Sequence, residues 1–188
     1  MIKQKLIEQL NIEFARLNKW LQNHPDDKFE EITREGKWSA GQHVKHLLMG
    51  ISPVNKAMTL PKFFLKYKFG ICNRNERTYE ELVVKYKTKL ANNTSAAPIR
   101  FSPDIITNSE KKDLIKKLEA QKIKMIKHIG KWSEKDLSTY ILPHPLLGKL
   151  TFREMIYFTS LHTDHHRKIL EEFHSQVNRN KTEIDASE

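Results

Sequence analysis

Apolar side chains recur at intervals of three and four residues along the first part of the chain. This spacing places them on one face of an amphipathic helix and predicts a helix over residues 2–23, which His24-Pro25 ends. A similar stripe predicts a long helix that opens near Ser109 and closes at Gly130, since glycine commonly ends helices. The apolar positions of these two helices are Ile2, Leu6, Leu10, Phe14, Leu17 and Leu21, then Leu114, Leu118, Met125 and Ile129.

Two further helices have well-specified starts, because each begins with a capping box. Ser39 can cap the first turn of one helix while Gln42, three residues later, reaches back to the cap. Thr151 and Glu154 repeat this arrangement at the start of the last long helix. Pro53 is expected to kink or interrupt the helix that begins at Ser39, because proline lacks a backbone N–H.

The segment between these helices, residues 60–103, is the least regular part of the chain. Pro98 and Pro103 punctuate it, and we expect only short helical pieces there. No stretch shows convincing strand alternation, so four long amphipathic helices predict an all-α four-helix bundle. A length of 188 residues is most simply one domain. We assign residues 1–176 to this bundle and residues 177–188 to a polar C-terminal tail.

The chain is strongly basic, with 33 Lys and Arg against 23 Asp and Glu and a formal net charge of +10. Clustered basic residues can bind nucleic acid by releasing counterions from phosphate. Here the lysines ring the predicted helices instead of forming a stripe, which is typical of a solvated surface. The distribution therefore disfavours a nucleic-acid partner.

The sequence also bears on the compartment. No run approaches about 18 apolar residues, so we expect no membrane span. The opening residues alternate charged with apolar side chains and lack the apolar core of a secretory signal, which predicts a cytoplasmic location. Cys72 is the only cysteine, which excludes an internal disulfide and any cysteine-based zinc knuckle.

Three histidines fall within five positions of the stretch LHTDHHRKIL, namely His162, His165 and His166. His162 and His166 are four residues apart, so they share one face of a helix and can hold a single metal ion. They interrupt an apolar stripe, and burying imidazoles is unfavourable unless their nitrogens find partners, which a divalent ion provides. His165 points about 100° away by helical geometry. The alternative interpretation is a hydrogen-bonded pair of core or rim histidines, since the HxxxH lacks the Glu of an HExxH helix.

A third ligand is available in the stretch QHVKHLL of the helix that begins at Ser39. His43 flanks the apolar face of this helix, whereas His46 lies well round the other side, so periodicity alone favours His43. The remaining histidines are interpreted as ordinary surface, helix-end or loop residues: His24, His128, His144 and His174. His144 comes just before the last long helix, in the motif PHPLLG, and the sequence leaves open whether it or His43 contributes to the site.

Three motifs in this order, WSAGQHVKHLL, AAPIRFSP and HPLLGKLTFREMIYFTSLHTDHHRKIL, resemble the DinB-like superfamily. The resemblance spans nearly the whole chain and implies an up-down four-helix bundle of the DinB-like type. It also implies a metal site formed by the His-Leu position of the second long helix and the HxxxH of the last, which are His46, His162 and His166 here. Many relatives carry an acid shortly after the His-Leu pair, where this chain has Leu48, Met49 and Gly50, so a general base from that position is missing.

Three neutral imidazoles leave the coordination sphere of a metal open, which is the arrangement of a catalytic site. Zinc is the default divalent metal for nitrogen ligands, and nickel, iron and manganese remain options. The resemblance implies a metal-dependent thiol S-transferase that activates a small-molecule thiol for attack on an electrophile. The alternatives are a metal-dependent hydrolase that activates water, or a non-catalytic bundle that binds metal or nucleic acid. The sequence leaves homodimer formation open.

Overall fold

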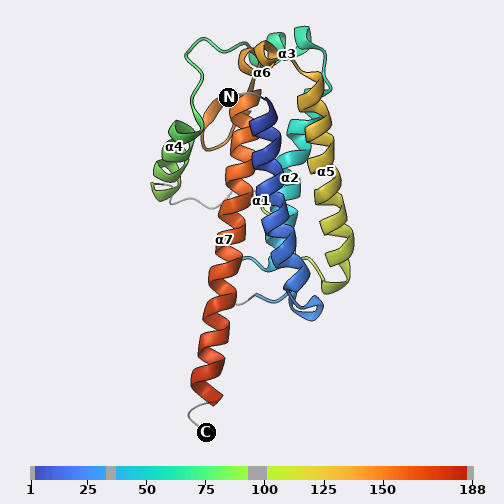
Figure 1. The fold of residues 1–188 in the computed structure, drawn as a ribbon, viewed down its shortest axis with the longest axis vertical. Coiled ribbons are helices and arrows are strands. Elements are labelled where there is room, and N and C mark those ends of the chain that lie inside the picture. The colour runs from blue at the N-terminus through green and yellow to red at the C-terminus, as the bar shows by residue number, and fades with distance from the viewer. Residues whose placement is uncertain (1–2, 33–36, 93–100, 186–188) are drawn as a thin grey trace.

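Four long helices form a bundle in the computed structural model, which describes residues 3–32, 37–92 and 101–185, with side chains as far as residue 172. The helices lie roughly side by side along the long axis of the molecule (Figure 1). They are α1 (Lys3–Asn23), α2 (Ala40–Met58), α5 (Lys111–Lys131) and α7 (Phe152–Asp185). The predicted bundle of four amphipathic helices is therefore confirmed.

The bundle core consists of the apolar stripes that the sequence predicts. Helix α1 packs mainly against α7, α2 packs mainly against α5, and contacts of α1 with α5 and of α2 with α7 close the bundle. Each fully buried Leu, Phe or Met contributes about 1.5–3 kcal/mol relative to an exposed one. The predicted core positions of α1 and α5 that the structure describes are all buried: Leu6, Leu10, Phe14, Leu17, Leu21, Leu114, Leu118, Met125 and Ile129.

Both predicted capping boxes are present. The Ser39 side chain accepts a hydrogen bond from the Gln42 backbone N–H, and the Gln42 side chain accepts one from the Ser39 N–H. At the start of α7 the same exchange joins Thr151 and Glu154, with both distances 3.0 Å. These caps fix the starts of the two helices that carry the histidine motifs.

The ends of two helices differ from the sequence prediction. Helix α2 continues through Pro53 to Met58, so the expected interruption is wrong. Helix α5 starts at Lys111, after the short helix η3 (Asn108–Glu110), and ends at Lys131, one residue beyond Gly130. Packing along the whole length of α2 outweighs the single backbone hydrogen bond that proline removes.

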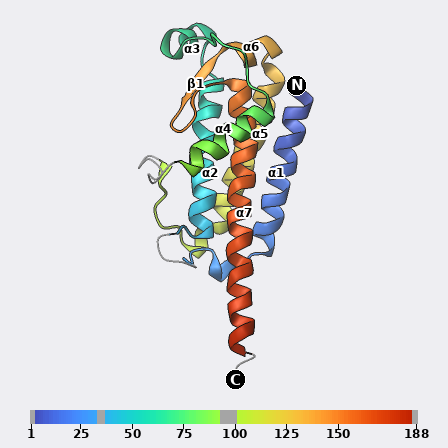
Figure 2. The same cartoon turned by 90° about the vertical axis from the view of Figure 1, so that its left-hand side faces the viewer.

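A two-stranded hairpin lies near one end of the bundle, close to the short helices α3 and α6 (Figure 2). Strand β1 (Ile141–His144) pairs antiparallel with β2 (Gly148–Thr151), and His144 lies opposite Gly148. The expectation of a chain without strands is wrong here, because four-residue strands are too short for alternation to be recognised. Gly148 has φ +76°, a conformation that glycine adopts without strain at this turn. The remaining elements are η1 (Asp26–Lys28), α3 (Lys62–Phe69), α4 (Tyr79–Ala91) and α6 (Glu134–Thr139).

Glu154 anchors the loop before α4 to the start of α7. Its side chain is fully buried, and its carboxylate accepts hydrogen bonds from both terminal nitrogens of Arg74 at 2.7 and 2.6 Å and from the Arg77 backbone N–H at 2.8 Å. Burial acts to raise the pKa of Glu154, but the bonds from Arg74, Arg77 and the Thr151 backbone outweigh it and hold the pKa below its usual value. The same contacts fix the hairpin, since Arg74 also donates to the Lys149 carbonyl.

Gly41 allows a close approach between the first turn of α2 and the segment that precedes α5. A Cβ atom at this position would lie 2.8 Å from Cβ of Ile106, closer than real side chains approach one another. Ile106 is buried there, and the segment continues back to Phe101. Phe101 contacts His46, so the segment also covers the side of α2 that the helical wheel treats as solvent-facing.

The C-terminal part of α7 extends past the other helices (Figures 1 and 2). Residues 177–185 belong to this helix, and residues 186–188 lie outside the described part. The division into a bundle domain of residues 1–176 and a tail of residues 177–188 stays a prediction. Within the described residues, no helix is both long and apolar enough to cross a membrane.

Candidate metal centre

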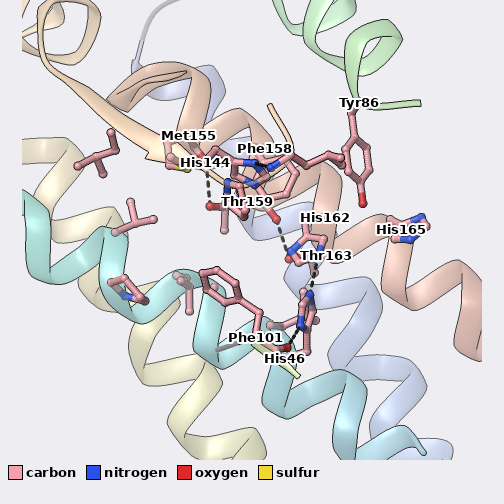
Figure 3. A pocket seen from close by; sticks show the side chains of 18 of the residues that line it. His46, Tyr86, Phe101, His144, Met155, Phe158, Thr159, His162, Thr163 and His165 are labelled. Carbon is pink, nitrogen blue, oxygen red and sulfur yellow. Dashed lines mark hydrogen bonds between the residues drawn. The ribbon is translucent and has the colours of Figure 1, made fainter. Parts of the chain in front are cut away.

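Three histidine side chains from two helices converge on one point. Nε2 of His162 lies 3.1 Å from Nε2 of His46 and 2.9 Å from Nε2 of His166. One ring nitrogen from each residue falls within 4.8 Å of the others. Figure 3 shows His46 and His162 pointing toward each other from α2 and α7. We call His46, His162 and His166 the three-histidine cluster.

A backbone carbonyl sets the tautomer of His46. Nδ1 of His46 lies 2.7 Å from the carbonyl oxygen of Phe101, which can only accept, so Nδ1 carries the hydrogen. The lone pair of the neutral ring is therefore on Nε2, the atom that faces His162. The segment that crosses α2 thus orients this imidazole, as second-shell carbonyls do for histidine ligands.

His43 takes the corresponding place next to His166. Nδ1 of His43 lies 2.7 Å from Nδ1 of His166, and both rings are buried. When His166 donates its Nδ1–H to His43, its lone pair is on Nε2 and faces the cluster. Nε2 of His43 then carries a hydrogen, and this buried atom has no hydrogen-bond partner among the described residues.

Burial keeps these imidazoles neutral. The exposed fraction is 9% for His46, 5% for His166 and 4% for His43. Desolvation lowers the pKa of His46, partly opposed by the bond to Phe101, and lowers the pKa of His43 to about 3. Desolvation, with repulsion from neighbouring imidazoles, lowers the pKa of His162 and His166 well below its usual value. Neutral imidazole is the form that binds a metal.

The donor set fits a divalent cation. In these tautomers the Nε2 atoms of His46 and His166 both direct lone pairs at His162, whose Nε2 can supply at most one hydrogen for the two of them. A cation between the rings would satisfy all three nitrogens at once. Nitrogen ligands without sulfur suit zinc first, and also nickel or iron. Metal binding by these three residues stays a prediction, and the donor set leaves the metal's identity open.

Trp38 covers the cluster on one side. Its ring centroid lies 4.8 Å from that of His46, and it stacks on His166 at 6.3 Å with an interplanar angle of 14°. The indole also contacts the edge of His43. This aromatic cover lowers the polarity around the nitrogens and limits the access of water from that side.

On another side the cluster borders a cavity of about 670 Å³ (Figure 3). All three histidines of the cluster line it. The other walls come from α2, α7, α4 and the β1–β2 turn. A volume of this size accommodates a drug-sized ligand. Apolar side chains make up most of these walls, among them Leu47, Ile51, Val54, Leu142, Leu146, Met155 and Phe158.

The helical wheel is wrong about His46. It places this residue away from the apolar face, whereas the structure turns its ring inward against Phe101 and His162. The physical reason is that α2 is covered on several sides, by α5, by α7 and by the segment before α5. His43, which periodicity favours, is buried as well but contacts His166 instead of facing the point where the cluster converges.

Two further histidines lie at the cavity. His165, expected to point away, lines it and packs edge-on against Tyr86. His144, interpreted from the sequence as an ordinary loop residue, also lines the cavity and packs on Phe158 with ring centroids 4.2 Å apart. Only its position shortly before the last helix, in the motif PHPLLG, could have drawn attention to it.

The remaining sequence interpretations concern residues away from the cluster. His24 stacks on Trp20 near the end of α1, and His128 lies in the last turn of α5. His174 lies outside the residues whose side chains are described. Gly50 lines the cavity beside His162, and among the described residues no Asp or Glu lines it.

Fold and site together define a four-helix bundle with a three-histidine cluster in the wall of an apolar cavity. The chain belongs to the DinB superfamily, because the family model matches residues 9–170. A comparison with curated proteins finds no match.

Two solved structures share the fold. The crystal structure of TT2238, described as a four-helix bundle protein, is 15% identical with a TM-score of 0.55, over 91% of this chain and 99% of that one. The crystal structure of a conserved protein from Enterococcus faecalis is 12% identical with a TM-score of 0.60, over 92% of this chain and 95% of that one. At these identities the similarity supports the fold.

Proposed function

We propose that the protein is a metal-dependent enzyme that conjugates a small-molecule thiol to an electrophile, with His46, His162 and His166 as the metal ligands. The observation that carries the proposal is the position of the three-histidine cluster, whose residues all line a cavity. A structural metal site is usually closed by a fourth protein ligand, whereas a catalytic site keeps a position for substrate.

A divalent ion held by three imidazoles supplies Lewis acidity, which favours the deprotonated form of a thiol at neutral pH. The protein's own residues provide the rest. Phe101 and His43 hold His46 and His166 in the tautomers that direct Nε2 toward the ion. Trp38 excludes water from one side, and the cavity places the electrophile beside the sulfur.

The reaction balances without a protein carboxylate. The thiol releases its proton to solvent, the sulfur forms a bond to an electrophilic carbon, and the leaving group departs with its electron pair. When the electrophile is a conjugated carbonyl compound, no group leaves. The electron pair of the attacked double bond moves to the carbonyl oxygen, and the resulting enolate takes up a proton. Binding both substrates side by side removes most of the entropic cost of the encounter.

The test begins with protein purified without a polyhistidine tag, whose metal content is measured by elemental mass spectrometry. Metal-loaded protein is then incubated with a panel of thiols, bacillithiol and glutathione included, and a chromogenic electrophile. We expect a metal-dependent rate with at least one thiol and none with the His166→Ala protein.

The other outcomes separate the alternatives. Equal rates for the two proteins would contradict the transferase proposal. A metal-dependent rate with water and no thiol would assign the site to a hydrolase, the second candidate, because the same cluster can activate water. Stoichiometric metal without any rate would support a non-catalytic metal-binding bundle.

A further inference from the structure

The described walls of the cavity beside the three-histidine cluster carry no charged side chain. Among the described residues that line it, none is Asp, Glu, Lys or Arg, although the chain as a whole is 30% charged. In the metal-free protein, a charged ligand in this space would lose its hydration without gaining an opposite charge from these side chains.

The hydroxyl groups of α7 offer little more polarity. Thr159 donates its hydroxyl hydrogen to the Met155 carbonyl at 2.9 Å, and Thr163 donates to the Thr159 carbonyl at 2.8 Å. Both bonds turn the hydroxyl hydrogens back toward the helix, where a ligand cannot receive them. What these residues present to the cavity is therefore mostly methyl groups and lone pairs.

His144 is different, because the hairpin turn fixes its tautomer. Its Nδ1 accepts hydrogen bonds from the backbone N–H groups of Leu146 at 3.2 Å and Leu147 at 3.1 Å. Two donors at one nitrogen require the lone pair there, so the hydrogen of the neutral ring is on Nε2. Burial, with a smaller effect from Lys85, lowers the pKa of His144 to about 4, and the ring stays neutral at physiological pH.

The Nε2–H of His144 is available to a ligand. The residue lines the cavity, and within the described part of the chain this N–H makes no hydrogen bond. Phe158 lies between it and the metal-ligand candidates, with its ring packed on His144 at 4.2 Å and stacked on His162 at 4.9 Å. His144 and His162 thus lie on either side of the Phe158 ring, in the same wall of the cavity (Figure 3).

From this arrangement we propose that the cavity binds an uncharged, largely apolar electrophile that carries one acceptor oxygen, such as a ketone or enone, and that His144 positions this oxygen through Nε2–H. The proposal rests on the proposed function, since it names the electrophile of that reaction. A neutral imidazole N–H can hold a carbonyl oxygen and stabilise the negative charge that develops there. The fixed tautomer means that the donor needs no rearrangement when the ligand enters.

The probe is prodan, a neutral dimethylaminonaphthyl ketone whose emission reports both the polarity around it and hydrogen bonding to its carbonyl. Dimethylaminonaphthoate has the same rings with a carboxylate and serves as the charged control. Binding is followed by fluorescence titration before and after removal of metal by a chelator. The naphthoate is compared after chelation, so that its carboxylate cannot bind a metal.

We expect prodan to bind in both states, and the naphthoate to bind at least about tenfold more weakly than prodan after chelation. Naphthoate binding as tight as that of prodan, or no binding of prodan at all, would overturn the proposal. Prodan binding needs no metal, so we expect it even if the protein binds no metal ion. Failure of this proposal is therefore distinguishable from failure of the proposed function.

The role of His144 is tested with His144→Asn. The Asn side-chain oxygen can accept the hydrogen bonds from Leu146 and Leu147 in place of Nδ1, while the Nε2–H of the longer imidazole ring is lost. We expect about fivefold weaker prodan binding and emission at shorter wavelength. An analogue of prodan that lacks the carbonyl group should bind the wild-type protein and the variant equally.

The analogue also provides a test in the wild-type protein, which does not depend on the folding of the variant. Loss of the carbonyl should weaken binding to wild-type protein by the same factor of about five. Equal binding of prodan and the analogue to wild-type protein would exclude His144 as the positioning donor.

Discussion

The Nε2 atoms of His46 and His162 lie 3.1 Å apart, although the residues are separated by 116 positions in the sequence and belong to different helices. Helices α2 and α7 pack against each other, and this contact brings the two rings together. A metal ion shared by these nitrogens would link the two helices. Substituting a histidine on either helix should therefore lower the affinity of the folded bundle for a divalent ion.

The substitutions His162→Ala and His166→Ala should each abolish stoichiometric metal binding and leave the bundle helical. The reason is that each removes one of three ligands, while the buried core of the bundle is unchanged. Elemental analysis and far-ultraviolet circular dichroism measure the two properties. One equivalent of metal retained in both variants would exclude the three-histidine assignment.

The substitution His46→Ala should weaken metal binding far more than His43→Ala. His46 faces His162 directly, whereas His43 acts through His166, and loss of such an orienting partner typically costs about 10–100-fold in affinity. Competition with a chelator of known affinity measures both variants. The reverse ranking would make His43 the ligand, and equal large losses would indicate a four-histidine site.

The metal-free protein should lose stability as the pH falls below about 6.5, the usual pKa of histidine in an unfolded chain. Burial lowers the pKa of folded His144 to about 4, so between these values the unfolded chain binds a proton that the folded protein excludes. The stabilisation is complete above the higher value and is lost as the pH falls toward the lower one, by about 1.4 kcal/mol for each unit of the shift.

Urea unfolding at several pH values, with wild-type protein and His144→Asn, measures this effect. The variant lacks the titrating ring, so its free energy of unfolding should decline less steeply over the same range. Carboxylates titrate in both proteins and cancel in the comparison. Parallel declines would contradict the lowered pKa of His144.

The substitution Gly41→Ala should destabilise the protein by about 1–3 kcal/mol, the usual cost of overpacking. The new Cβ would meet Ile106 at 2.8 Å and push away the segment that carries Phe101, so metal affinity should fall as well. Gly130→Ala is the matched control, because a Cβ there meets nothing within 4 Å and alanine favours the helix. Thermal unfolding of both variants measures the difference, and equal effects would exclude the clash.

Local patterns in the sequence determine most of the bundle. The stripes through Leu10 and Leu118 predict the buried faces of α1 and α5, because helical periodicity needs only neighbouring residues to be read. Ser39 and Thr151 predict the starts of α2 and α7 for the same reason, since a capping box is complete within four residues. The HxxxH spacing likewise places His162 and His166 on one face of a helix.

Periodicity does not decide which histidine of α2 faces them, although the family resemblance implies His46, and the tertiary structure alone decides which other histidines reach the cavity. The helical wheel favoured His43 over His46 because it treats a helix as having one buried side, whereas the segment around Phe101 and Ile106 covers a second side of α2. The sequence left the place of His144 open, because it depends on a hairpin of four-residue strands and on a cavity formed by distant elements. Burial on a second face and the shape of a cavity arise from contacts between remote segments, and such contacts leave no periodic pattern in the sequence.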